Sequence, residues 1–243
     1  MKALILAAGL GTRLKPLTNS TPKALLQVGQ FTLLEFAIQK VASHGFTDIV
    51  VNVHHFAQQV VDYLTANKNF GYNIMISDES DKLLDTGGAI KKALPLLSGD
   101  EPFLVYNADI ISNIDLTAFY TYHLNYGGLA TLAVRRRETS RYLLFDEYMQ
   151  LTEWQNIEKG LRKIIRLSQK PPQPLAFSGI HIIDSSIATL LPNWDAFSII
   201  DTYIEIGKNN IIRGFLDESS IFIDAGKPAS LKQAAQITTS NLF

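Results

Sequence analysis

The strongest constraint on the fold is the alternation of apolar runs with helical patterns over residues 2 to 110. Short apolar runs of this kind are typical of buried strands, and the segments between them carry apolar residues at helical spacing. Such alternation predicts right-handed βαβ units, and therefore an α/β fold with a mostly parallel, doubly wound sheet. We expect strands at 2–6, 48–53, 73–77 and 103–107, and helices at 31–44, 58–64 and 87–94.

The second half of the chain is richer in strand patterns. Ligands of doubly wound sheets bind beyond the carboxyl ends of the strands, so this β-rich part is expected to form the far wall of a crevice there. We expect strands at 128–134, 142–145, 160–167, 175–183 and 220–224, and helices at 198–207 and 227–236.

Composition narrows the classes of function. The chain has 243 residues, 47% of them hydrophobic, which suits one α/β domain or a domain with a small appendage. A net charge of −1 does not give the basic footprint of a nucleic-acid-binding protein. The absence of cysteine excludes disulfides and thiolate metal sites. Neither a signal-peptide pattern nor an apolar run of about 18 residues is found, so we expect a cytoplasmic protein that does not bind membranes.

The loop after the first strand has the composition of a phosphate-binding site. Ala7, Ala8, Gly9 and Gly11 are small enough to let main-chain N–H groups approach an anion, and Arg13 follows them. The spacing is not that of a dinucleotide-binding loop, which needs a third glycine, nor that of a P-loop, which needs Gly-Lys-Ser/Thr. A glycine-rich turn is also common in α/β proteins without any phosphate.

Two aspartates follow predicted strands at distant positions in the chain. Asp109 comes after the strand at 103–107, and Asp224 ends the strand at 220–224. Carboxylates at the carboxyl ends of strands, facing a phosphate, are suitable ligands for Mg²⁺, which prefers one or two carboxylates together with substrate phosphates. The alternative is that each is a turn or helix-capping residue.

Taken together, these segments resemble the sugar-1-phosphate nucleotidyltransferase family, in its short bacterial form. The resemblance rests on Gly9-Leu-Gly-Thr-Arg-Leu-Lys-Pro-Leu-Thr18 with Pro22-Lys23, on Asn107-Ala-Asp109 and on Phe222-Ile-Asp-Ala-Gly-Lys-Pro228. It implies a Rossmann-like, doubly wound mixed sheet with a β-rich sugar-binding lid. It also implies one domain over 1–243, with a nucleotide part at about 1–110 and 210–243 and a sugar part at about 111–209.

The family resemblance also implies roles for individual residues. The nucleotide is expected to contact Ala7, Ala8, Gly9, Gly11, Thr12, Arg13, Lys23, Asp85, Thr86, Gly87 and Gly88, of which Arg13 and Lys23 are catalytic. The sugar is expected to contact Asn107, Glu153, Ser178, Gly179 and Asp201. The cofactor is Mg²⁺, held by Asp109 and Asp224. The five histidines have no metal-ligand spacing and are expected to be structural or exposed.

One departure from the family pattern concerns the sugar phosphate. Leu151-Thr-Glu-Trp154 stands where many relatives have Glu-Lys-Pro, so the lysine that grips the phosphate is missing. Lys227, Lys163 or Arg166 are candidates to replace it. The departure is shared by the branch that acts on N-acetylmuramate 1-phosphate.

The resemblance implies that a nucleoside triphosphate, UTP being favoured, and a sugar 1-phosphate give an NDP-sugar and pyrophosphate. A guanylyltransferase for mannose or heptose 1-phosphate, a cytidylyltransferase for phosphocholine, and a non-catalytic sugar-nucleotide sensor or subunit are alternatives. A dinucleotide oxidoreductase is disfavoured by the missing third glycine. Relatives are monomers or homodimers, and the chain is expected to lack the left-handed β-helix, with its acyltransferase activity, that long relatives append.

Overall fold

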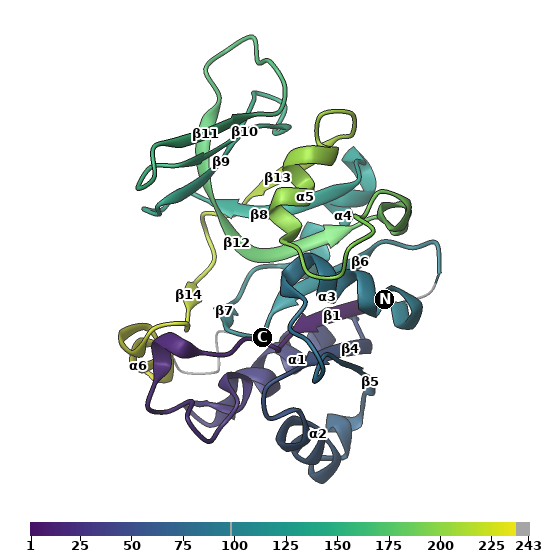
Figure 1. Cartoon of the computed structure of the whole chain (residues 1–243), viewed down its shortest axis with the longest axis vertical. Helices are drawn as coiled ribbons and strands as arrows, with labels where there is room; N and C mark the ends of the chain where they lie inside the picture. The colour runs from purple at the N-terminus through teal and green to yellow at the C-terminus, as the bar shows by residue number, and fades with distance from the viewer. Residues whose placement is uncertain (98, 237–243) are drawn as a thin grey trace.

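The computed structural model describes residues 1–97 and 99–236, and one large mixed sheet runs through both halves of the chain (Figure 1). Along the sheet the strands follow the order β11-β10-β9-β12-β6-β1-β4-β5, and β8 pairs with β12 and with β13. The strands are β1 (Lys2–Leu6), β2 (Gln27–Val28), β3 (Phe31–Thr32), β4 (Asp48–Val53), β5 (Asn73–Asp78), β6 (Phe103–Asn107), β7 (Ile110–Ser112), β8 (Ala130–Arg135), β9 (Arg141–Phe145), β10 (Leu151–Asn156), β11 (Leu161–Ile164), β12 (Gln173–Ile183), β13 (Ile212–Leu216) and β14 (Phe222–Asp224).

The first half has the predicted parallel βαβ architecture. β1 lies between β4 and β6, parallel to both, and β4 is parallel to β5. Alternate residues of β1 enter different cores, since Ala3 and Ile5 belong to one cluster of buried side chains and Leu4 belongs to another. Burial on both faces explains why β1 is an unbroken apolar run. The helices are α1 (Leu33–Ser43), α2 (Ala57–Ala66), α3 (Asp85–Ala93), α4 (Leu116–Tyr126), α5 (Ile199–Ile206) and α6 (Pro228–Ala235).

The second half extends the sheet with antiparallel strands, as the mixed fold class requires. β12 is antiparallel to β6, β8 and β9, and its register shifts between Phe177 and His181. Gly179 lies at this shift with φ +74°, a backbone conformation that favours glycine. β9, β10 and β11 then form the antiparallel end of the sheet, which lies at the top of Figure 1.

Several elements differ from the sequence expectations. The strand β10 and the helix α4 were not expected, since neither segment has a clear apolar period. β13 pairs with β8, so residues 212–216 belong with the second half and not with the nucleotide part assigned to 210–243. The remaining C-terminal elements do return to the first half, where α6 lies beside the N-terminal segment (Figure 1).

The C-terminal elements and the first half of the chain together form a third, small core. Leu14, Leu26 and Leu33 of the first half pack with Ile223 of β14 and Ala234 of α6. β14 also pairs with β7 through antiparallel bonds. Packing between these N-terminal and C-terminal segments therefore fixes the loop after β1 and the end of β14 relative to each other.

None of the helices within 1–97 and 99–236 combines the length and apolarity needed to cross a bilayer.

Candidate functional site

A buried amide holds the small-residue loop at the end of β1. Asn52 Oδ1 accepts hydrogen bonds from Ala7 N at 2.6 Å and from Ala8 N at 3.3 Å. Its Nδ2 donates to Glu79 Oε1 at 2.8 Å, and Leu84 N donates to Glu79 Oε2 at 3.3 Å. The main-chain N–H groups of Ala7 and Ala8 are thus hydrogen-bonded to a side chain, although both residues line the first cavity described below.

The loop turns back on itself at Gly11. Gly11 has φ +61°, and a methyl group there would lie 2.8 Å from Thr18 Cγ2 and 3.0 Å from Lys23 Cβ. Its carbonyl oxygen accepts hydrogen bonds from Leu14 N at 2.8 Å and from Thr18 Oγ1 at 2.9 Å. The tight turn therefore requires glycine and brings the Lys23 side chain against the loop.

Four charged groups converge beside Gly226. The Lys23 ammonium donates a hydrogen bond to Asp109 Oδ2 in an ion pair. A methyl group at Gly226 would lie 2.8 Å from an Arg13 guanidinium nitrogen, 2.8 Å from Asp224 Oδ1 and 3.4 Å from Lys23 Nζ. The structure thus brings together both predicted catalytic cations and both predicted metal ligands.

The two aspartates are adjacent because β7 and β14 pair. Asp224 lies opposite Ile110 in the ladder, and Ala225 N donates to the main-chain oxygen of Asp109 at 2.9 Å. Within residues 1–97 and 99–236, no group of three or more histidine, aspartate or glutamate side chains is arranged to hold a metal ion. Two neighbouring carboxylates nevertheless suit Mg²⁺, which prefers one or two carboxylates together with substrate phosphates.

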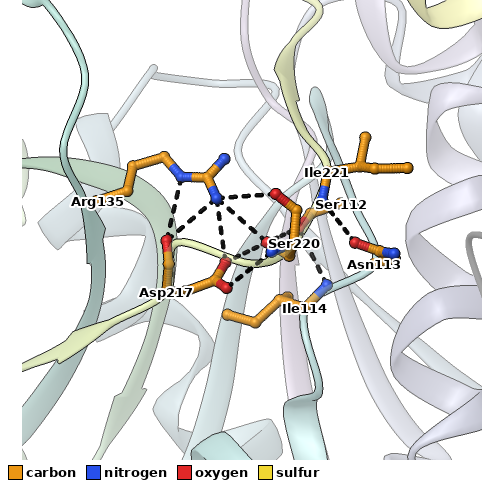
Figure 2. Close-up of polar contacts among 7 residues, drawn as sticks. All are labelled: Ser112, Asn113, Ile114, Arg135, Asp217, Ser220 and Ile221. Atoms are coloured by element: carbon orange, nitrogen blue, oxygen red, sulfur yellow. Dashed lines mark hydrogen bonds and ion pairs between the residues drawn. The ribbon is translucent and has the colours of Figure 1, made fainter.

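An arginine anchors the turn that precedes β14 (Figure 2). Arg135 Nη2 donates to the main-chain oxygens of Asp217 and Ser220 at 3.1 and 3.0 Å. Ser220 Oγ lies 3.3 Å from Ser112 Oγ, and Ile221 N donates to the Asn113 side chain at 2.6 Å. These bonds join β8, β7 and the turn, and so fix where Asp224 emerges.

A cavity of about 390 Å³ opens between the loop after β1 and the start of α3. It is lined by Leu6, Ala7, Ala8, Gly9, Lys23, Ala24, Leu33, Asn52, Glu79, Leu83, Asp85, Thr86, Ala89, Asn107, Ala108 and Asp109. We call it the inner cavity. Its apolar walls with a few polar side chains are typical of a pocket for a small molecule.

Gly87 and Gly88 of α3 do not line the inner cavity. Methyl groups there would lie 2.3 Å from the Phe197 ring and 2.0 Å from the Asp195 carbonyl oxygen, respectively. Gly87 N also donates to the Phe197 carbonyl oxygen at 2.8 Å. The glycine pair therefore lets α3 approach the segment before α5, and of the four residues expected at the nucleotide here, only Asp85 and Thr86 line the inner cavity.

Two further cavities, of about 520 and 270 Å³, continue the cleft toward the β-rich half. The larger shares Leu6, Asp85, Thr86 and Asn107 with the inner cavity, so the two are continuous. We call this pair the outer cavities. Among the side chains that line both of them are Arg141, Trp154, Phe177, Ser198, Ile200 and Asp201.

Two of the five predicted sugar-binding residues line the cleft, and the other three do not. Asn107 and Asp201 line the cleft, and Gly179 packs against Asn107, whose Nδ2 would lie 2.8 Å from a methyl group at Gly179. Ser178 is buried, and its hydroxyl has no partner within the described part of the chain. Glu153 lines none of the three cavities because Arg162 holds it, with two hydrogen bonds of 2.6 and 2.7 Å.

The fold and the convergent charged cluster agree with a comparison against protein families. The model described as "Nucleotidyl transferase" matches residues 2–240. The chain belongs to this family. The expectation from the loop after β1 and the two aspartate motifs is therefore confirmed at the level of the family.

Relatives within the nucleotidyl transferase family differ in the substrates that their names give. The N-acetylmuramate alpha-1-phosphate uridylyltransferase of Neisseria meningitidis serogroup B is 45% identical over 120 residues, which is 49% of this chain and 52% of that protein. A mannose-1-phosphate guanyltransferase of Gibberella zeae is 29% identical over 249 residues, 100% of this chain and 65% of that protein. The chain thus spans roughly half to two thirds of the length of these curated relatives.

Solved structures confirm the nucleotidyl transferase fold. A putative glucose-1-phosphate thymidylyltransferase from Bacillus anthracis, solved in complex with sucrose, superposes with a TM-score of 0.81. The superposition covers 98% of this chain and 96% of that one at 23% identity. At this identity the likeness supports the mixed α/β architecture only.

Sequence reasoning missed some of the residues that line the cleft. Asn52 and Glu79 each follow or end an apolar run, which is the same signal that identified Asp109. Arg141 and Lys159 come from β9 and from the turn after β10, where no pattern marks a side chain as facing a ligand.

Proposed function

We propose that the protein transfers a nucleotidyl group from a nucleoside triphosphate to a sugar 1-phosphate, releasing pyrophosphate. The observation that carries this proposal is the convergence of Arg13, Lys23, Asp109 and Asp224 next to the inner cavity. The inner cavity suits the nucleoside and the outer cavities suit the sugar. The cluster then stands where the two substrates meet.

The metal in this proposal is Mg²⁺, held by Asp109 and Asp224 together with substrate phosphate oxygens. When bound, Mg²⁺ supplies charge neutralisation and polarises the α-phosphate. Support comes from the donor set, which is two carboxylates brought together by the pairing of β7 and β14.

The cations in the cluster have separate tasks. We assign Lys23 to the α-phosphate and the incoming sugar phosphate, because its ammonium lies between the loop after β1 and Asp109. Arg13 stabilises the departing pyrophosphate. The sugar-phosphate oxygen attacks the α-phosphorus in line, the P–O bond to pyrophosphate breaks, and no general base is needed because the phosphate is already ionised. Catalysis then consists of positioning and electrostatic stabilisation.

UTP is the nucleotide that we favour. Support comes from two uridylyltransferases for N-acetylmuramate 1-phosphate, 45% and 46% identical over roughly half of this chain. A guanylyltransferase for mannose 1-phosphate is the second candidate, because such relatives align over the full chain at lower identity. Since nucleoside triphosphates are made in the cytoplasm, we place the reaction there.

The test pairs UTP, GTP, CTP and dTTP with glucose, mannose and N-acetylmuramate 1-phosphates in the presence of Mg²⁺. Pyrophosphate release is measured for each pair, and thermal shift is measured for each nucleotide. Release with UTP supports the proposal, and release with GTP alone supports the second candidate. A thermal shift without any release indicates a non-catalytic sensor and contradicts the proposal.

A further inference from the structure

The proposed function brings a phosphate into the cleft between the charged cluster and the outer cavities. The sugar phosphate must reach the α-phosphorus beside Lys23 while its sugar lies among Trp154 and Phe177. A dianion held at that junction would be stabilised further by hydrogen bonds from a cationic side chain on the sugar side. Three cationic side chains line the outer cavities: Arg137, Arg141 and Lys159.

The three candidates named from the sequence do not line the outer cavities. Lys163 Nζ donates to Asp201 Oδ1 at 2.9 Å and lies 5.2 Å from the centroid of the Trp154 ring. Arg166 donates to main-chain carbonyl groups after α5 and to a glutamine side chain, and it does not line the outer cavities. Lys227 is the N-cap of α6 and lines none of the three cavities.

Arg137 connects the smaller outer cavity to the strand that ends at Asp224. Its guanidinium carbon lies 5.3 Å from the centroid of the Phe222 ring, two residues before Asp224, and its Nη2 donates to the Phe177 carbonyl oxygen at 3.0 Å. It therefore bridges the strand that carries a metal ligand and the strand that lines the sugar side. Partial burial lowers the pKa of Arg137, while Asp224 acts in the opposite direction. An arginine so placed stays protonated at neutral pH.

The guanidinium of Arg137 is held in place by hydrogen bonds to main-chain oxygens and not by an ion pair. Its hydrogen-bond partners are the main-chain oxygens of Phe177 and Glu138, at 3.0 and 3.5 Å. Within residues 1–97 and 99–236 its guanidinium forms no ion pair with a carboxylate. A guanidinium has five N–H donors, so donors remain for an anion. The neighbouring Arg136 is different, because it pairs with Glu218 at 2.6 Å and lines none of the cavities.

We propose that Arg137 binds the phosphate group of the sugar 1-phosphate at the junction of the charged cluster and the outer cavities. The inference rests on the proposed function for the identity of the anion. It assigns to the connection between β8 and β9 the phosphate contact that the aromatic Trp154 on β10 does not supply. Arg137 is on this account a substrate-binding residue of the transfer reaction.

The kinetic test compares Arg137→Ala with Arg136→Ala, its matched control from the same connection. Arg137→Ala is expected to raise KM for the sugar 1-phosphate about 10- to 100-fold, the range for a hydrogen bond between charged groups. KM for the nucleoside triphosphate should stay within about twofold, and Arg137→Lys should restore part of the loss. Arg136→Ala should behave as the wild type. An unchanged KM for the sugar 1-phosphate in Arg137→Ala overturns the inference and leaves the proposed function standing.

A binding measurement separates the inference from turnover. The chain has two tryptophans, and Trp154 lines both outer cavities whereas Trp194 is 64% exposed. In a Trp194→Phe background, sugar 1-phosphate should quench Trp154 fluorescence. Arg137→Ala should weaken binding of the phosphorylated sugar but not of the same sugar without phosphate.

The two measurements have distinguishable outcomes. Arg137-dependent quenching without pyrophosphate release supports the inference and contradicts the transfer reaction. Equal weakening for both forms of the sugar shows a structural role for Arg137 and overturns the inference. A wild-type protein that shows neither quenching nor release overturns both proposals.

Discussion

Lys23 and Asp109 form an ion pair that joins the segment after β1 to the short connection between β6 and β7. The same carboxylate is our proposed ligand for Mg²⁺, so Lys23 and the metal would share one carboxylate. With a triphosphate bound, the Lys23 ammonium would have phosphate oxygens as further partners. The ion pair keeps both groups oriented until the substrates arrive.

Asp109→Asn is expected to lower turnover by at least about 10²-fold, because an uncharged amide neither holds Mg²⁺ well nor orients Lys23. The Mg²⁺ concentration for half-maximal rate should rise. Steady-state kinetics at several Mg²⁺ concentrations and circular dichroism check this. Asp100→Asn, on an exposed turn away from the cleft, is the control. A rate equal to that of the wild type would remove Asp109 from the metal site.

Lys23→Ala is expected to lower turnover by orders of magnitude with a different metal dependence. The variant loses the cation for the α-phosphate, but it also frees Asp109 from its ion pair. The half-saturating Mg²⁺ concentration should therefore stay the same or fall. Comparison with Asp109→Asn by the same titration checks the assignment, and near-normal kinetics would exclude Lys23 from the mechanism.

Asn52→Ala is expected to destabilise the protein by about 1–3 kcal/mol, because the buried Ala7 N–H loses its acceptor and Glu79 Oε1 loses the Asn52 donor. KM for the nucleoside triphosphate should rise as the loop loses its anchor. Urea unfolding and initial rates measure the two effects. Asn73→Ala removes an exposed bond to Asp48 and should cost less than about 0.5 kcal/mol. Equal costs for the two variants would contradict a special role for Asn52.

Gly226→Ala is expected to impair catalysis more than folding. The added methyl group would lie 2.8 Å from both an Arg13 nitrogen and Asp224 Oδ1, so these groups must separate. Gly71→Ala is the opposite case, since its methyl group meets open space but its φ of +81° is strained. Turnover should fall in the first variant and thermal stability in the second. Turnover that falls equally in both would show that Gly226 has no special place in the cluster.

The parallel half of the fold was predictable because its strands are buried on both faces. A strand such as β1 must then be apolar throughout, and the chain has to return through helices. β10 was not predictable in this way. Its residues Glu153 and Trp154 are stabilised by partners on β11, through an ion pair with Arg162 and contact with Lys163, and not by an apolar period.

The charged cluster was predictable from motifs, but the roles of glycines were not. A glycine pair such as Gly87-Gly88 looks the same in a sequence whether a ligand or another segment of the chain approaches it. Only the packing of the Phe197 segment against α3 decides this. The orientation of Glu153 likewise depends on Arg162, nine residues away on the next strand.

His181→Gln is expected to reduce the sensitivity of the fold to acid. Burial lowers the pKa of His181 to about 3, and its Nδ1 lies 2.7 Å from the Tyr203 hydroxyl oxygen. Because the folded-state pKa is below the unfolded value of about 6.5, the unfolded state binds the proton more readily between these values. Stability from this group is complete above pH 6.5 and falls as the pH is lowered from 6.5 toward 3.

The expected loss is about 1.4 kcal/mol for each pH unit inside that window. Glutamine keeps a hydrogen-bonding group near Tyr203 but has no proton to gain in this range. The free energy of unfolding, measured in urea from pH 7 to pH 4.5 for both proteins, should therefore decline less steeply in the variant. Parallel declines would show that His181 does not stay neutral inside the fold.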